Sequence, residues 1–172
     1  GVYGDTNGAW VDESAPIGRG RRTARVQADQ DWGALRVDMR RFRLPGIYGP
    51  GRSALDRVRA GRAHRIDLPN QIFSRIHVDD ITKGIIASFG GAPGVYNLAD
   101  DLPCSQNRVI ELACDLTTLP WPPLQSLDAA KLSPMARGFY AENRRVANGR
   151  AKRLLGWTPD YPTYVEGLRA CL

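Results

Sequence analysis

The sequence predicts a domain of the α/β class, in which strands and helices alternate along the chain. Apolar residues recur at spacings of three and four in some segments, as in helices, and form short runs in others, as in strands. Gly and Pro separate these segments. Hydrophobic residues make up 42% and charged residues 24% of the 172 residues, which is the composition of a globular protein with a core. No linker divides the sequence into two domains.

The first 50 residues predict a loop, a helix and a strand. Gly, Asp, Asn and Pro punctuate residues 1–20, which we expect to form a loop. Residues 21–35 predict an amphipathic helix. Its apolar face would hold Ala24, Ala28, Trp32 and Leu35. Residues 37–44 predict a strand that ends at the turn-forming pair Pro45-Gly46.

Shorter elements follow in the middle of the chain. Ser53 is expected to cap a short helix that carries Leu55 and Val58, and Gly61 closes this helix. Ile66 lies in a short extended piece. A second, less regular extended piece contains Phe73, Ile76 and Val78.

A longer helix is predicted after residue 78. Asp79 or Asp80 would cap it, and Gly90-Gly91 would stop it. Its apolar face would hold Ile81, Ile85 and Phe89. A short strand over residues 95–98 follows.

Three more helices are expected after residue 104. Ser105 caps the first, Asn148 caps the second, which ends at Gly156, and Thr163 starts the third. A proline-rich stretch over residues 120–123 breaks the first of them. The second helix is expected to bury Leu154 and Leu155. The apolar residues of the other two helices are Val109, Leu112, Ala113 and Leu116 in the first, and Val165, Leu168 and Leu172 in the third.

The basic residues are unevenly chosen, because 21 Arg stand against 3 Lys in a chain of net charge +6. The Arg are spread over nearly every segment without interleaved aromatic residues, which does not favour a nucleic-acid-binding surface. Coding bias is the simplest explanation, and recognition of an anionic substrate stays open. No apolar run is long enough to cross a bilayer, so no membrane association is expected.

The three cysteines, Cys104, Cys114 and Cys171, have no metal-like spacing and form no disulfide pattern. We therefore expect small buried side chains and a cytoplasmic protein. His77, Asp79 and Asp80 also make a poor metal site, because they have no distant partner. A hydrogen-bonded His and a capping Asp explain this group, and no metal is predicted.

Several common catalytic and phosphate-binding motifs are absent from the printed sequence. It contains no G-x-G-x-x-G after a strand, no G-x-x-x-x-G-K-[ST], no G-x-S-x-G and no H-E-x-x-H. Gly46, Gly49 and Gly51 have the wrong spacing for a dinucleotide-binding turn. The 172 residues therefore contain no self-sufficient phosphate cradle, nucleophile elbow or zinc site.

Five short motifs occur in order along the chain. They are GVYG at residues 1–4, RLPGIYGPG at 43–51, RIHVDD at 75–80, GVYNL at 94–98 and LGWTP at 155–159. In this order they resemble the latter part of an extended short-chain dehydrogenase/reductase of the NAD-dependent epimerase/dehydratase type. The closer resemblance is to atypical members described as NAD(P)-dependent oxidoreductases, and it covers nearly the whole chain.

The resemblance implies the C-terminal part of a Rossmann-type, doubly wound parallel sheet with a small substrate-binding lobe. Residues 1–50 would be the last part of the cofactor-binding sheet, and residues 51–172 mainly the substrate-binding part of a single partial domain. The glycine-rich half that holds NAD or NADP would lie upstream. The substrate would be a small polar molecule, such as a sugar nucleotide or another carbonyl compound, and a homo-oligomer stays open.

The resemblance also raises a question about catalysis. In the family, a Tyr and a Lys four residues later share one helix face, and an acidic residue often follows four residues after the Lys. Asp29 fits this acidic position, which puts Arg25 at the Lys position and Arg21 at the Tyr position. Arg cannot exchange a proton near neutral pH, so the usual Tyr is missing. Tyr3 is a weak candidate for a substitute, and packing explains it more simply.

The resemblance suggests further residues for the cleft. Pro45, Gly46 and Ile47 would form the turn that contacts the nicotinamide end of the cofactor, although such a pair is also an ordinary turn. His77 would lie towards the cleft. Candidates for gripping an anionic substrate are Arg52, Arg75, Arg144 and Arg145.

Three functions remain open at this point. The first is an NAD(P)-dependent oxidoreductase or epimerase that acts on a small molecule. The second is a cofactor-binding regulator or scaffold that has lost the chemistry, which the pair Arg21 and Arg25 would suit. The third is a basic interaction module with acidic targets, which salt-dependent binding to polyanions would reveal.

Overall fold

The computed structural model describes residues 1–18, 22–35 and 38–172 of the chain. Every strand pair of two or more residues in this part is parallel. The pairs are β1 (Trp10–Val11) with β8 (Arg145–Val146), β2 (Arg40–Arg43) with β6 (Gly94–Asn97), β3 (Gly46–Tyr48) with β5 (Arg75–His77), and β4 (Arg65–Ile66) with β7 (Leu124–Gln125). Parallel strands need long crossovers, and helices provide most of them here. The predicted α/β class is confirmed.

Seven α-helices and one short 3₁₀-helix are found in the described residues. They are α1 (Thr23–Leu35), α2 (Ala54–Arg59), α3 (Val78–Ala87), the 3₁₀-helix η1 (Ser88–Gly90), α4 (Gln106–Thr117), α5 (Pro134–Phe139), α6 (Gly149–Leu155) and α7 (Tyr164–Arg169). None of these helices is long and apolar enough to span a membrane.

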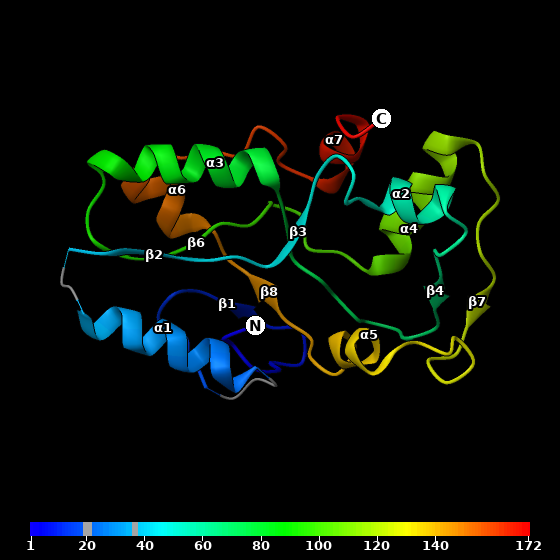
Figure 1. The fold of residues 1–172 in the computed structure, drawn as a ribbon, viewed down its shortest axis with the longest axis horizontal. Helices are drawn as coiled ribbons and strands as arrows, with labels where there is room; N and C mark the ends of the chain where they lie inside the picture. Colours follow the sequence, from blue (N-terminus) through cyan, green and yellow to red (C-terminus); the bar gives the residue numbers. More distant parts are fainter. Residues whose placement is uncertain (19–21, 36–37) are drawn as a thin grey trace.

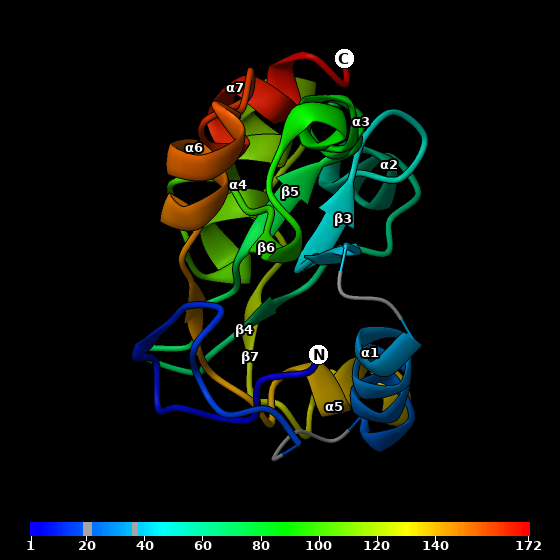
Figure 2. The same ribbon diagram turned by 90° about the vertical axis from the view of Figure 1, so that its left-hand side faces the viewer.

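Helices lie on both sides of the paired strands β2 and β6 (Figures 1 and 2). Helices α3 and α6 cover one side, and α1 lies on the other. This arrangement is that of a doubly wound sheet, as predicted. The other end of the molecule holds α2, α4 and α7, with the β4–β7 pair and α5 below them in Figure 1.

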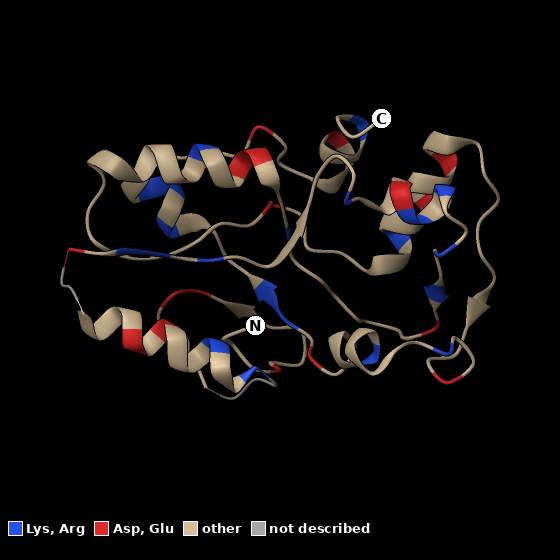
Figure 3. Cartoon of the chain, in the orientation of Figure 1, with Lys and Arg blue, Asp and Glu red and all other residues tan. Residues whose placement is uncertain are grey.

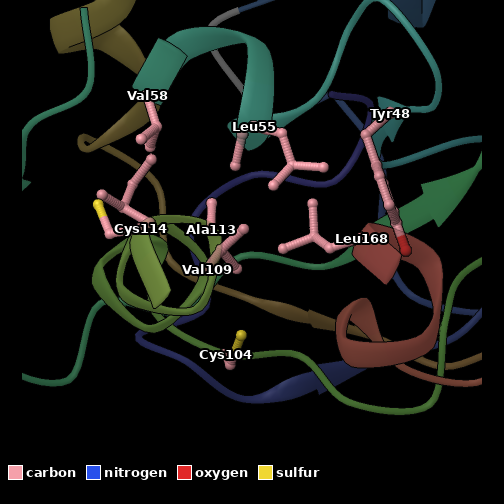
Figure 4. Close-up of a cluster of buried hydrophobic side chains, with 10 residues drawn as sticks. Tyr48, Leu55, Val58, Cys104, Val109, Ala113, Cys114 and Leu168 are labelled. Carbon is pink, nitrogen blue, oxygen red and sulfur yellow. The ribbon is translucent and has the colours of Figure 1, made fainter. Parts of the chain in front are cut away.

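The largest core cluster joins α2, α4 and α7 (Figure 4). Ser53 starts α2, with its backbone N–H donating to the Asp56 carboxylate at 2.6 Å. Ser105 starts α4, with its hydroxyl accepting from the N–H of Arg108 at 3.3 Å. Gly61 follows α2 with φ +63°, a conformation that costs glycine little. These helix starts and this stop were all expected from the sequence.

A close contact joins β3 to α7 in this cluster. The Tyr48 hydroxyl lies against the backbone of Gly167, and a Cβ at Gly167 would be only 1.9 Å from it. Leu168 packs beside Tyr48, as Figure 4 shows. Thr163 caps α7 as predicted, because its hydroxyl accepts from the N–H of Val165.

A second cluster places α3 against β6 and the segment after α6. Its members are Ile76, Tyr96, Leu98, Ala151 and Trp157. Gly84 of α3 makes the close packing possible, because a Cβ there would be 2.6 Å from the Leu98 side chain. The face of α3 that carries Asp80 and Gly84 is therefore the buried one.

The predicted cap and apolar face of α3 need correction. His77 is the N-cap, and its Nδ1 accepts from the N–H of Asp79 at 3.3 Å. Asp80 is buried, and its carboxylate accepts from the N–H groups of Asp160 and Tyr161. Turning this face inward leaves Ile85 and Phe89 outside, and Phe89 is 78% exposed.

The predicted apolar face of α1 is also wrong. Trp32 is 59% and Leu35 68% exposed, and Val26 is the buried residue of the described helix. One reason is electrostatic: Asp29 accepts from Arg43 of β2 at 2.7 Å, which turns the side of α1 that carries Asp29 towards β2, while Ala28 and Trp32 border open space. The remainder of the predicted face, Ala24 and Ala28, is exposed as well.

Smaller differences concern the ends of elements. Gly46 and Ile47 belong to β3 instead of a turn, because they pair with Arg75 and Ile76 of β5. Asn148 starts α6 without a side-chain capping bond, and instead donates to the carbonyl of Ala99 at 2.7 Å. Leu154 is half exposed. The residues at the start of the strand predicted over 37–44 include Val37, which lies outside the described part, and β2 begins at Arg40.

Candidate functional site

A large hollow separates α1 and α5 from the strands and helices above them. Its volume is about 1180 Å³. Residues of α1, β2, β3, α2, β5 and α5 border it. This volume lies above the range that is usual for a pocket holding one small molecule.

Most of the residues predicted for the site border this one hollow. They are Tyr3, Pro45, Gly46, Ile47, Arg52, Arg75 and Arg144. The structure thus brings together segments that are up to 141 positions apart in the sequence. His77 and Arg145 are not among the bordering residues.

Tyr3 lies in a buried hydrogen-bond network at the hollow. Its hydroxyl donates to Oδ1 of Asn97 at 2.7 Å and accepts from Arg43 at 3.0 Å. Burial raises the pKa of Tyr3, and the Arg43 guanidinium opposes that effect only in part. Tyr3 therefore stays protonated at neutral pH, with its proton engaged by Asn97. This geometry suits a packed structural residue better than a proton shuttle.

Arg75 is held by neutral groups alone. Its guanidinium donates to the carbonyls of Phe73, Cys104 and Ser105 at 3.1–3.3 Å, and to the side chains of Cys104 and Gln106. The residue is only 6% exposed, and no carboxylate among the described residues accepts a hydrogen bond from it. A fixed, buried positive charge at the edge of the hollow results.

Asp100 is the charged group buried beside Arg75. It is 1% exposed, and both carboxylate oxygens lack a hydrogen-bond partner among the described residues. Burial raises the pKa of Asp100 to about 7, although the Arg75 charge acts in the opposite direction. Asp100 thus titrates near neutral pH, and its proton state alters the field felt by Arg75.

His77 has a structural role in this arrangement. It caps α3 and packs edge-on against the Tyr48 ring, with the two ring centroids 5.2 Å apart. The centroid of the Tyr161 ring lies 4.2 Å from that of His77. Because Nδ1 accepts a hydrogen bond, the proton lies on Nε2, which faces the Cys171 sulfur at 3.6 Å. Arg145 donates to the carbonyl of Gly8, on the far side of β8 from the hollow-lining Val146.

The segment that contains helix α1 is where the family resemblance places the catalytic Tyr and Lys. Arg25 borders the hollow, and Asp29 binds Arg41 and Arg43 of β2. Arg21 lies outside the described residues. Within the described part of α1 there is no Tyr and no Lys, and Arg25 stands at the position expected for the Lys.

The border of the hollow is strongly basic. Among the described residues its cations are Arg22, Arg25, Arg40, Arg41, Arg43, Arg52, Arg57, Arg62, Arg75 and Arg144. Three carboxylates also border it: Asp29, Asp56 and Glu142. Figure 3 shows the basic stretch of β2 facing α1 across this region. An anionic ligand is favoured by this field.

Sequence reasoning missed four of these residues that lie together at one end of the hollow. They are Arg57, Arg62, His64 and Tyr140. The three Arg and one His within residues 57–64 were a signal, but Tyr140 is 76 positions from His64 and no sequence pattern links the two. The described residues contain no group of three His, Cys, Asp or Glu that could bind a metal.

Comparisons with known proteins place this geometry in context. No protein-family model matches the chain. A solved protein of unknown function from Silicibacter pomeroyi is 47% identical, with a TM-score of 0.92 over 99% of this chain and 62% of that protein. The human epimerase family protein SDR39U1, solved with NADPH, has a TM-score of 0.77 at 17% identity, over 98% of this chain and 61% of that one.

Two further matches extend the comparison. A dTDP-glucose 4,6-dehydratase from Bacillus anthracis, solved with NAD, has a TM-score of 0.73 at 17% identity, over 98% of this chain and 56% of that one. The chain has the fold of the NAD-dependent epimerase/dehydratase family. A curated relative from Streptomyces, a 3-diazoavenalumate denitrifying reductase, is 32% identical over 139 residues, which are 74% of this chain and 45% of that protein.

The epimerase/dehydratase fold confirms the resemblance drawn from the five ordered motifs. The Rossmann-type α/β architecture is likewise confirmed. The chain spans less than two thirds of the length of the proteins that it matches.

Proposed function

We propose that the chain is part of an NAD(P)-dependent oxidoreductase or epimerase that acts on a small polar substrate. The observation that carries the proposal is that one hollow collects Tyr3, the segment 45–47 and Arg75, which come from distant parts of the sequence. The epimerase/dehydratase fold and the cofactors present in similar solved proteins support it. A sugar nucleotide or another carbonyl compound is the proposed substrate class.

The segment 45–47 suits the nicotinamide end of the cofactor. Gly46 and Ile47 are exposed at the hollow, and Pro45 precedes them. The nearest atom to a Cβ at Gly46 would be the Ser74 carbonyl oxygen at 3.4 Å, so this position leaves room on its open side. The flat nicotinamide ring could pack against this apolar segment. We propose that the pyrophosphate is held by a glycine-rich segment outside the 172 residues.

The bound cofactor would supply hydride transfer. The described residues would bind the substrate and supply an electrostatic field. Arg75 presents a fixed positive charge that would orient an anionic substrate or polarise a carbonyl group. Arg25 would hold the cofactor electrostatically without accepting a proton. Proton transfer would then depend on a group other than the usual Tyr.

A regulator that binds the cofactor without turnover is the second candidate. The observation favouring it is the lack of a Tyr–Lys pair on the described part of α1, together with the engaged proton of Tyr3. Turnover by the full gene product would separate the two candidates. Both candidates require cofactor binding.

Cofactor binding is tested by titrating NADH and NADPH, by fluorescence, into the full gene product. Gly46→Val should weaken binding of the preferred cofactor roughly tenfold, because its side chain occupies the hollow. Gly90→Val is the matched control, since Gly90 has open space around it and does not border the hollow. Equal affinities in the two variants would contradict the assignment of residues 45–47, and no binding at all would contradict the proposed function.

A further inference from the structure

The basic–aromatic corner of the hollow consists of Arg57, Arg62, His64, Phe73 and Tyr140. Arg57 lies in the last turn of α2, and Arg62 and His64 lie in the segment that leads to β4. Phe73 precedes β5, and Tyr140 ends α5. Four separate segments thus converge on one place.

Contacts within the corner fix its arrangement. The Tyr140 hydroxyl lies 3.4 Å from Nε2 of His64. The Tyr140 and Phe73 rings pack edge to face, with centroids 5.5 Å apart. The N–H of Arg62 donates to the carbonyl of Arg57 at 2.9 Å, which keeps the two arginines on adjacent turns of the chain. The Phe73, Tyr140 and His64 rings are therefore held together without a ligand, and the backbone places the exposed Arg57 and Arg62 beside them.

The two arginines give the corner a positive charge. The guanidinium groups of Arg57 and Arg62 form no ion pair with any residue in the described part of the chain. The nearby carboxylate of Asp56 is engaged by Ser53. Burial lowers the pKa of His64, and the Arg57 charge lowers it further. Arginines that stay unpaired beside a hollow provide forks suited to a carboxylate or phosphate.

The aromatic rings at the corner indicate what kind of group could bind beside the two arginines. Phe73 and Tyr140 border the same hollow as the two arginines, and Phe139 borders it as well. Arg22 lies over the Phe139 ring at 5.5 Å, so this side of the hollow already pairs aromatic with cationic groups. Aromatic side chains gain favourable stacked or edge-to-face contacts with an aromatic ring of a ligand.

We propose that the basic–aromatic corner binds an aromatic ligand through its anionic group, a carboxylate or a phosphate, held by Arg57 and Arg62. The aromatic part of the ligand packs against Phe73 and Tyr140. The identification of this ligand as the substrate rests on the proposed function, whereas the binding itself does not. The inference therefore narrows the substrate to one that carries both an aromatic group and a negative charge.

The experiment uses three probes on the full gene product by isothermal titration calorimetry. Cinnamate carries a carboxylate, phenyl phosphate carries a phosphate, and cinnamyl alcohol has the ring without charge. At least one anionic probe should bind, and the alcohol should bind at least tenfold more weakly. The stronger of the two anions identifies the anionic group.

Matched arginine variants locate the binding. Arg57→Gln should weaken the anionic probe about tenfold or more. Arg59→Gln is the control, because Arg59 is exposed on the same helix and does not border the hollow. Tyr140→Leu should weaken the same probe and leave its salt dependence unchanged, since it removes a ring without removing charge. Thermal melts of each variant verify folding.

Three results would overturn the proposal: binding of neither anion, equal binding of the alcohol, or equal losses in the Arg57 and Arg59 variants. The NADH and NADPH titrations on the same samples separate this proposal from the proposed function. If an anionic probe binds and neither NADH nor NADPH does, only the proposed function is contradicted. If a cofactor binds and neither anionic probe does, only the proposed ligand site at the basic–aromatic corner is contradicted.

Discussion

At the scale of single residues, the buried pair Arg75 and Asp100 dominates the physical chemistry of the site. Arg75 is satisfied by carbonyl groups, which leaves its charge uncompensated by hydrogen bonding to a carboxylate. Asp100 is equally buried and has no hydrogen-bond partner among the described residues. The two groups compensate each other through space, and this compensation depends on pH because Asp100 titrates near neutrality.

Asp100 makes stability depend on pH. Its pKa is about 7 in the folded chain and 3.8 ordinarily, so the folded state retains a proton that the unfolded state releases between these values. The free energy of unfolding should therefore fall as pH rises from about 4 to about 7, by on the order of 2–4 kcal/mol, and then level off. Urea unfolding at pH 5 and pH 8 measures this fall.

Two variants isolate the Asp100 contribution. In Asp100→Asn this decrease in stability between about pH 4 and about pH 7 should disappear, and the variant should be more stable than the wild type at pH 8, because it removes the cost of burying a charged carboxylate. Asp101→Asn is the control, since Asp101 pairs with Lys152 at 2.6 Å near the surface. In Asp101→Asn the free energy of unfolding should still fall as pH rises from about 4 to about 7. A wild-type curve parallel to that of Asp100→Asn would refute the assignment.

At the scale of elements, the helix caps are the features best predicted from sequence. Ser53, Ser105 and Thr163 all begin helices as expected, because a side-chain or backbone group at each satisfies local N–H donors. The faces of α1 and α3 were harder to predict. Asp29 and Asp80 turn towards the interior to bind distant partners, and spacing alone contains no information on those partners.

The cap of α4 yields a test at this scale. Ser105→Ala should lower the free energy of unfolding by about 1 kcal/mol, because the N–H of Arg108 loses its acceptor. Ser133→Ala changes the same type of cap on α5, a helix with no buried residues, and should cost less overall stability. Chemical unfolding of both variants provides the comparison. A larger loss for Ser133→Ala would be inconsistent with this account.

At the scale of the whole molecule, the hollow divides the chain into parts of unequal stability. Helices α2, α4 and α7 share a core, whereas α1 buries Val26 alone in its described part and α5 buries nothing. Amide hydrogen exchange should accordingly be fastest in α1 and α5 and slowest in α4 and the β5–β6 region. A ligand that fills the hollow should slow exchange in α1 and α5 selectively. Uniform exchange across the molecule would contradict this division.

The same scale shows what the sequence could and could not predict. The α/β class and the order of motifs were accessible, because Gly, Pro and apolar spacing are local signals. Tyr3, residues 45–47 and Arg75 were placed at one site by resemblance, and the structure brings them to one hollow. The pairing of His64 with Tyr140, by contrast, arises only when α5 folds back on the segment after α2. Such long-range meetings depend on tertiary packing.

The contact between Tyr48 and Gly167 constrains how the sequence can diverge. The phenol hydroxyl occupies the space that any side chain at position 167 would need. Gly167 therefore cannot become Ala while Tyr48 is present, and Tyr48→Phe would not suffice, because the ring atoms Cζ and Cε2 would still lie 2.7 and 2.9 Å from the new Cβ. Homologues that have lost this glycine should therefore carry a residue smaller than an aromatic ring at position 48.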